Sequence, residues 1–344
     1  MHLIEQDLLK YENLRTAKGQ PFFSVLSSSE LVNKNGGDLT QTESEKLCEF
    51  LDQLIGSQNS TIIARGESDE NLKNQYNFDT ENPELLAECI FMAGEKGRMC
   101  WNEKKFIDPD DTSSDNFRSI CETLKKYIKE ECKGDTKKAK KMRVFYLRNK
   151  QFCDAFNSID SLVCKYEKLL DNDKKMVNLY YLSIVHTIDN SSEYKEVSNF
   201  VSTSTNFSVA KNFSNYATIY GWVPRRPMRK GIKSIDFVVI KYGSNVKKLK
   251  MPSCETPAFP KQKEIALRCG ILPHFIIGFN IGQKFYVNPA IFNSPNDREM
   301  DDIVCNGLII DQTDFEEFCN KYTKFKRYYT FDGNKYEMHV LKNN

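Results

Sequence analysis

The segment Phe200–Ser204 ends in three consecutive hydroxyl side chains. An aromatic and a β-branched residue followed by small hydroxyl residues are typical of a strand and its end. Thr205 or Asn206 is placed to cap a short helix that carries Phe213 one helix length away. Hydroxyls in this position can hydrogen-bond a sugar or hold a carboxylate, and the aromatic ring can stack on a flat ring. A strand end with a purely structural role has the same pattern.

A second candidate is Arg65, which lies near the end of the β-branched segment Thr61–Glu67 and directly precedes Gly66. A guanidinium at a strand end can bind a phosphate through two parallel hydrogen bonds, and a glycine lets the backbone approach the ligand closely. The alternative is a surface arginine before a turn.

A third candidate is the pair Gln262 and Glu264, two residues apart where a strand begins. Side chains at this spacing lie on the same face of a strand. The pattern therefore predicts an amide and a carboxylate side by side.

The composition shows which broad class of protein the chain belongs to but does not identify its function. The 344 residues carry a formal net charge of +2, with 40% hydrophobic and 12% aromatic residues, which indicates a folded globular chain. We expect no metal site because His2, His186, His274 and His339 are far apart and have no Cys or His at zinc-ligand spacing. The eleven cysteines, an odd number without a recognisable signal peptide, suggest reduced thiols in a cytosol, either that of the producing cell or that of a host. No membrane segment is expected.

The elements around these candidates suggest how they are positioned. Thr42 and Glu45 predict a capping box for a helix with an apolar face from Leu47 to Ile55, ended by Gly56. Residues 117–190 show three apolar stripes at helical spacing. Beyond residue 195 short strands dominate, and we expect them at Ile235–Ile240, Phe275–Phe279 and Lys284–Val287.

The chain resembles the mono-ADP-ribosyltransferases of the arginine–serine–glutamate class, which include bacterial toxins. The resemblance rests on three segments in the same order: the arginine strand, the Ser-Thr-Ser strand with its aromatic, and the Gln-x-Glu segment. The resemblance implies an α+β fold, a split mixed β-sandwich of the ADP-ribosyltransferase type with N-terminal helices and a helical insertion. The expected segments are a helical lead-in at 1–60, the first part of the core at 61–100, the insertion at 101–190 and the rest of the core at 191–344. The insertion accounts for the long separation of Arg65 from Ser202.

The resemblance implies NAD as the substrate and no metal. Glu264 becomes the catalytic acid that stabilises the ribosyl cation, Ser202 holds this glutamate and the sugar, and Gln262 meets the acceptor. The NAD-binding set is Arg65, Gly66, Thr203, Ser204 and Phe213, with Arg65 on the diphosphate and Phe213 on the nicotinamide ring. Arg148, at the end of the strand-like run Val144–Arg148, is an alternative to Arg65.

Gln262 stands where arginine-modifying members carry glutamate, which argues against arginine as the acceptor. The acceptor is then a nucleobase of RNA or DNA or another protein side chain, and the basic loops at 225–230 and 247–250 favour a nucleic acid. An antitoxin, immunity protein or chaperone is an expected partner, since an uncontrolled transferase harms its own cell. The competing hypotheses are an inactive transferase-like module that binds a nucleic acid or a protein, and a helical interaction protein.

Overall fold

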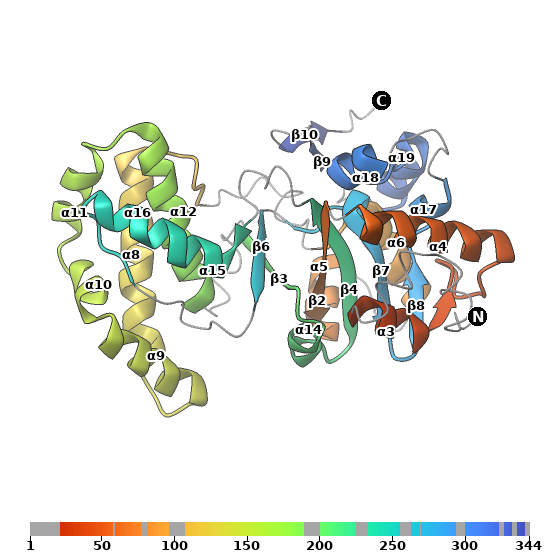
Figure 1. Cartoon of the computed structure of the whole chain (residues 1–344), viewed down its shortest axis with the longest axis horizontal. Coiled ribbons are helices and arrows are strands. Elements are labelled where there is room, and N and C mark those ends of the chain that lie inside the picture. Colours follow the sequence, from red (N-terminus) through yellow and green to blue (C-terminus); the bar gives the residue numbers. More distant parts are fainter. Residues whose placement is uncertain are drawn as a thin grey trace. The chain divides into compact units, whose positions relative to one another are not determined.

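The structure, a computed structural model, describes residues 21–57, 59–76, 82–95, 107–188, 200–224, 233–254, 263–268, 270–293, 300–322, 327–331 and 336–340. The chain divides into two units by its internal contacts, and each is described by itself (Figure 1). Unit 1 comprises Met1–Glu103, Ser202–Lys230 and Cys269–Asn344. Unit 2 comprises Lys104–Val201 and Gly231–Arg268. The chain contains both helices and a mixed β-sheet, so its fold is α+β.

Unit 1 is built on a mixed sheet with the strand order β1-β8-β7-β4-β2-β3. Only β1 and β8 are parallel, and the other neighbouring pairs are antiparallel. The strands are β1 (Glu30–Val32), β8 (Lys284–Val287), β7 (Ile276–Ile281), β4 (Ala217–Pro224), β2 (Ser60–Glu67) and β3 (Phe200–Ser204). Of β3, the residues from Ser202 onward belong to unit 1, and Phe200 and Val201 belong to unit 2. The strand that carries Arg65, β2, therefore lies between β4 and the Ser-Thr-Ser strand β3, so the sheet brings together segments that are far apart in the sequence.

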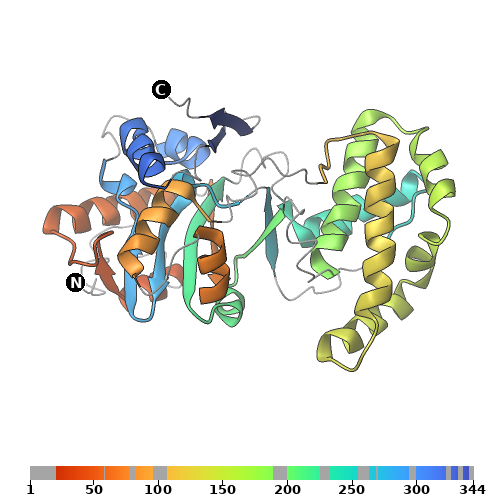
Figure 2. The same ribbon diagram turned by 180° about the vertical axis from the view of Figure 1, so that it is seen from behind.

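Successive side chains of a strand point to opposite faces of the sheet, and in unit 1 both faces are covered by other side chains. On one face Trp222 packs against Phe50 and Phe275, and its indole N–H donates to the carbonyl of Val304 at 3.2 Å. On the other, Phe279 packs against Phe91. Figures 1 and 2 show α4 and α18 on the first face and α5 and α6 on the second. The helices of this unit are α3 (Pro21–Ser27), α4 (Gln41–Gly56), α5 (Asp69–Tyr76), α6 (Pro83–Ala93), α14 (Phe207–Phe213), α17 (Ala290–Asn293), α18 (Met300–Asn306) and α19 (Gln312–Lys321), with a hairpin of β9 (Arg327–Phe331) and β10 (Tyr336–Val340).

The predicted capping box of α4 was placed two residues too late. Thr40, rather than Thr42, is the N-cap: its hydroxyl accepts from the backbone N–H of Glu43 at 3.2 Å, and the carboxylate of Glu43 accepts from the N–H of Thr40 at 2.8 Å. Both pairs have the same spacing, so the sequence alone did not separate them. The predicted end at Gly56 is confirmed.

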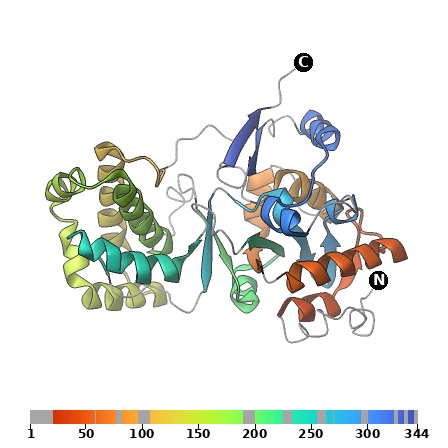
Figure 3. The same cartoon turned by 45° about the horizontal axis from the view of Figure 1, so that its top comes forward.

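Unit 2 is mainly helical and packs around aromatic side chains. Phe117 of α8 stacks on Tyr166 of α11 with ring centroids 3.9 Å apart, and Tyr181 of α12 contacts both Phe117 and Phe156. Figures 1 and 3 show α12 beside α8. The helices are α8 (Ser114–Glu131), α9 (Lys137–Arg148), α10 (Lys150–Ala155), α11 (Ile159–Tyr166), α12 (Asp171–Ile188), α15 (Ile235–Phe237) and α16 (Gly243–Lys248), with a pair of short strands, β5 (Lys233–Ser234) and β6 (Glu264–Arg268).

Two strand predictions in unit 2 are wrong. The β-branched run Ile235–Ile240 is helical: α15 leads into a π-helical turn, Val238–Tyr242, whose Val238 and Val239 are buried in the helical core. Val144–Arg148 is the last part of α9. Short apolar runs fit a buried strand and a buried helix equally well, so tertiary packing decides between them.

Among the helices that the structure describes, none has an apolar stretch of the length needed to cross a lipid bilayer.

Candidate functional site

The guanidinium of Arg65 joins the ends of two strands in unit 1. Pairing with β4 fixes its backbone opposite Ile219, and the next strand, β3, lies on the other side. Nη1 donates to the backbone carbonyl of Ser202 at 2.6 Å. The predicted arginine and the first hydroxyl residue are therefore brought together, although 137 residues separate them in the chain.

Two carboxylates hold the same guanidinium. Nε donates to Oε1 of Glu95 at 2.8 Å, and Nη2 forms an ion pair with Glu67. The side chain of Arg65 is 14% exposed, against 1% for Glu67 and 0% for Glu95. Burial alone lowers the pKa of Arg65, but the two carboxylates together outweigh it and raise the pKa, so the guanidinium stays charged.

The charge balance of this cluster bears on what it can bind. One guanidinium and two carboxylates give a formal charge of −1, which opposes the binding of a diphosphate at this point. Arg65 has five N–H donors, and the three contacts with Ser202, Glu95 and Glu67 use three of them. Among the residues that the structure describes, the other two donors have no partner, so they are available to a ligand.

Glu95 is the member of the cluster that sequence reasoning missed. It follows α6, and its backbone N–H and carbonyl pair with Ile271 at 2.8 and 2.9 Å. The hydroxyl of Tyr76 donates to the carbonyl of Gly94 at 2.7 Å and so fixes the residue before it. No local pattern links Glu95 to Arg65, because the contact depends on how α6 packs in unit 1.

The hydroxyl strand end forms as predicted, but its side chains differ in exposure. Thr203 and Ser204 are buried, whereas Ser202 is partly exposed. The hydroxyl of Ser204 accepts from the backbone N–H of Asn206 at 2.9 Å, and Asn206 caps α14 by accepting from the N–H of Ser208. Of the three residues, Ser202 is therefore the most exposed.

Gly66 is needed for the packing of α14 against β2. A Cβ at this position would lie 2.0 Å from the carbonyl oxygen of Ala210 and 2.7 Å from the N–H nitrogen of Ser214. Both are backbone atoms, so a side chain would displace the helix that carries Phe213. Phe213 itself is 64% exposed at the end of α14, where an aromatic ring is free to stack on a ligand.

We expect Gly66→Ala to lower the free energy of unfolding of unit 1 by about 1–3 kcal/mol, the usual cost of an added methyl group in a packed site. Urea unfolding followed by tryptophan fluorescence measures this, because the buried Trp222 reports on this unit. Gly37→Ala, in an exposed loop where the nearest atom belongs to the side chain of Asn33, is the control. Equal unfolding midpoints for the Gly66 variant and the wild type would show that α14 does not need this close approach.

Glu264 lies in unit 2, at the start of β6, and its carboxylate meets a histidine. Oε1 is 3.1 Å from Nε2 of His186, in the last turn of α12. Both side chains are largely buried, at 8% and 11% exposed. The ring of His186 also packs edge-on against Phe200 with centroids 5.9 Å apart. An imidazole N–H in this position orients the carboxylate and stabilises its charge.

The backbone directly before Glu264 is strained. Lys263 has φ +46°, in the left-handed region that a non-glycine residue seldom adopts. Strain of this kind persists only where the surrounding structure imposes it, and it is frequent at functional sites. Gln262, the predicted partner of Glu264, lies outside the described residues. That Glu264 approaches Ser202 stays a prediction.

The alternative arginine, Arg148, does not have the predicted setting. It is an exposed residue at the C-terminal end of α9, not at the end of a strand. Helix α9 forms because Thr136 caps it and Ala139, Met142 and Phe145 bury one face. Arg65 is therefore the better candidate for a strand-end arginine.

In the described ranges, His, Cys, Asp and Glu side chains form no group of three that could hold a metal ion. The cysteines in the same ranges are free thiols. Comparison of the chain with known protein families, with characterised proteins and with solved structures finds no match.

Proposed function

We propose that the chain is an NAD-dependent mono-ADP-ribosyltransferase that moves ADP-ribose from NAD to a macromolecule other than an arginine side chain and releases nicotinamide. The observation that carries the proposal is the 2.6 Å hydrogen bond from Arg65 to the carbonyl of Ser202, which joins the arginine strand to the Ser-Thr-Ser strand. The proposal extends to the fold: the sheet of unit 1 is one part of a split β-sandwich of the transferase type, and the helices of residues 101–190 are its insertion.

The reaction assigns a physical task to each residue. Breaking the bond between nicotinamide and ribose gives an oxocarbenium-like cation, which a nearby carboxylate stabilises as it forms. Glu264 supplies this charge, and His186 keeps the carboxylate oriented. The two remaining donors of Arg65 bind the diphosphate, and Phe213 stacks on the nicotinamide ring.

Gln262 directs the acceptor. An amide donates and accepts hydrogen bonds but does not remove a proton, so it suits an acceptor that is already nucleophilic, such as a nucleobase or an amide side chain. An antitoxin, immunity protein or chaperone that restrains this activity is part of the proposal.

One observation favours the alternative, an inactive transferase-like module that binds a nucleic acid or a protein. Glu67 and Glu95 give the Arg65 cluster a formal charge of −1, and a guanidinium held in this way can serve the fold alone. A transferase consumes NAD and releases nicotinamide, whereas an inactive binding module does neither. Incubation with NAD labelled in its adenosine moiety, with separate pools of protein, RNA and DNA, tests them: we expect release of nicotinamide and label in one pool. Absence of both from a folded protein would favour the alternative.

His186 provides a second test of the same site. We expect His186→Ala to lower the rate of nicotinamide release about 10–100-fold, since a hydrogen bond to a charged group contributes about 1.5–3 kcal/mol. The Michaelis constant for NAD should change little, because the imidazole orients Glu264 without contacting the dinucleotide. His186→Gln, which keeps an N–H donor, should lose less. A wild-type rate for His186→Ala would remove His186 from the mechanism.

A further inference from the structure

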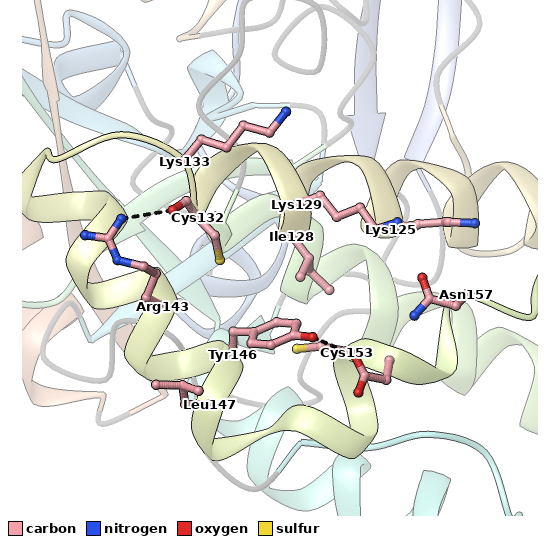
Figure 4. Close-up of a pocket in the computed structure, with 11 residues that line it drawn as sticks. Lys125, Ile128, Lys129, Cys132, Lys133, Arg143, Tyr146, Leu147, Cys153 and Asn157 are labelled. Atoms are coloured by element: carbon pink, nitrogen blue, oxygen red, sulfur yellow. Dashed lines mark hydrogen bonds between the residues drawn. The ribbon is translucent and has the colours of Figure 1, made fainter.

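Unit 2 contains a pocket that the proposed transferase reaction does not use. It has a volume of about 540 Å³ and lies among α8, α9 and α10 (Figure 4). Pockets of about 300–1,000 Å³ are the size that small ligands occupy. Figure 4 shows Ile128 and Cys132 pointing from α8 toward Tyr146 and Cys153.

The inner wall of the pocket is apolar. Ile128 is buried, and the exposed Leu147 extends the wall to the outside. The two thiols add no charge, because burial raises the pKa of Cys153 to about 12 and also raises the pKa of Cys132. Protonated thiols behave as small apolar groups, so this wall favours the hydrocarbon part of a ligand.

The charged groups around the pocket are mainly basic. The one carboxylate, that of Asp154, accepts from the hydroxyl of Tyr146 at 2.6 Å and forms an ion pair with Lys150, so its charge is balanced. Arg143 is also engaged, through hydrogen bonds to the carbonyls of Cys132 and Gly134 at 3.0 and 2.6 Å and an ion pair with Asp135 at 3.5 Å.

Lys125, Lys129 and Lys133 differ from these groups, because no ion pair or hydrogen bond engages their ammonium groups in the part of the chain that the structure describes. Lys125 and Lys129 are four residues apart, so they lie on the same face of α8. Figure 4 shows both side chains on the side of the pocket where Asn157 lies, while Lys133 points away. This side therefore offers two cations and an amide donor next to an apolar wall.

We propose that this pocket binds an amphipathic anion: an apolar chain against Ile128, Tyr146 and Cys153, and a single carboxylate headgroup at Lys125 and Lys129. The assignment follows from charge complementarity at one side and from the uncharged apolar wall at the other. It goes beyond the proposed transferase function and does not depend on it.

Calorimetric titration of the full chain with decanoate below its micelle-forming range tests the headgroup contact. We expect the double variant Lys125→Gln/Lys129→Gln to bind decanoate about tenfold more weakly, because each partly exposed ion pair contributes modestly. Lys137→Gln/Lys140→Gln, on exposed positions of α9 outside the pocket, removes the same charge and should bind like the wild type. Equal affinity for decanoate and uncharged decanol, or equal loss in both double variants, would overturn the proposal.

A second pair of variants tests the apolar wall. Leu147 is 72% exposed at the pocket and Leu170 is 76% exposed elsewhere, so neither substitution by aspartate should unfold the chain. Leu147→Asp should weaken decanoate binding about tenfold or more, and Leu170→Asp should leave it unchanged.

Bound decanoate should also slow alkylation of Cys132 by N-ethylmaleimide without protecting the exposed Cys164, as read by peptide mass spectrometry. Binding that is insensitive to Leu147→Asp and leaves Cys132 unprotected would place decanoate outside this pocket.

Discussion

Glu264→Gln is expected to lower the rate of nicotinamide release from NAD by about 10²–10³-fold, the usual effect of removing one preorganised electrostatic group. The substitution keeps the size and shape of the side chain and removes its charge. A cation that forms on the ribose then has no carboxylate beside it, so the barrier to bond cleavage rises. Binding of NAD should remain, because the proposal assigns the diphosphate to Arg65 and the nicotinamide ring to Phe213.

The measurement is single-turnover release of nicotinamide, together with NAD affinity from calorimetry. The amide of the variant still offers an oxygen to Nε2 of His186, so the fold of unit 2 should be unchanged and circular dichroism should show this. Glu122→Gln, at an exposed position of α8, removes the same charge at a residue outside the pair. A Glu264→Gln variant that releases nicotinamide at nearly the wild-type rate would remove Glu264 from the reaction.

The largest stability effect is expected for Arg65→Ala, at about 3–5 kcal/mol of the free energy of unfolding of unit 1. Glu67 and Glu95 are 1% and 0% exposed, and both form ion pairs with this guanidinium. Without it these two buried carboxylates lose the cation that they share. The hydrogen bond to the carbonyl of Ser202 is lost as well, which removes a link between β2 and β3.

Urea unfolding followed by tryptophan fluorescence measures this loss, and Lys73→Ala is the control. The pair Lys73–Asp69 is exposed, at 40% and 44%, and its removal should cost about 0.3–0.5 kcal/mol. A loss no larger than that of Lys73→Ala would show that the carboxylates find other compensation and that the cluster is not held by Arg65.

The parts of the site that the sequence predicted are those set by local chemistry. Asn206 begins α14 because its side chain can accept from the first free N–H groups, and Gly56 ends α4. The strands at Arg65 and at Ser202 follow from β-branched and hydroxyl residues within five to eight positions. Information of this kind lies within one element, so a single sequence carries it.

The parts that were missed depend on contacts across the chain. Glu95 reaches Arg65 over 30 residues, and His186 reaches Glu264 over 78, and no local pattern marks Glu95 or His186 as a partner. Ile235–Ile240 has a strand-like composition, yet it is helical because its valines pack into the helical core of unit 2. Two cap pairs with equal spacing, at Thr40 and at Thr42, also left the start of α4 open until the structure showed the box at Thr40.

The most direct test of the transferase proposal is a crystal structure of the Glu264→Gln variant with NAD, since this variant should bind the dinucleotide without cleaving it. The proposal predicts one NAD molecule with its diphosphate within hydrogen-bond reach of Arg65, at about 2.6–3.2 Å, and a ribose hydroxyl at the same distance from residue 264. An NAD molecule that contacts only one of these two positions, or none, would contradict it.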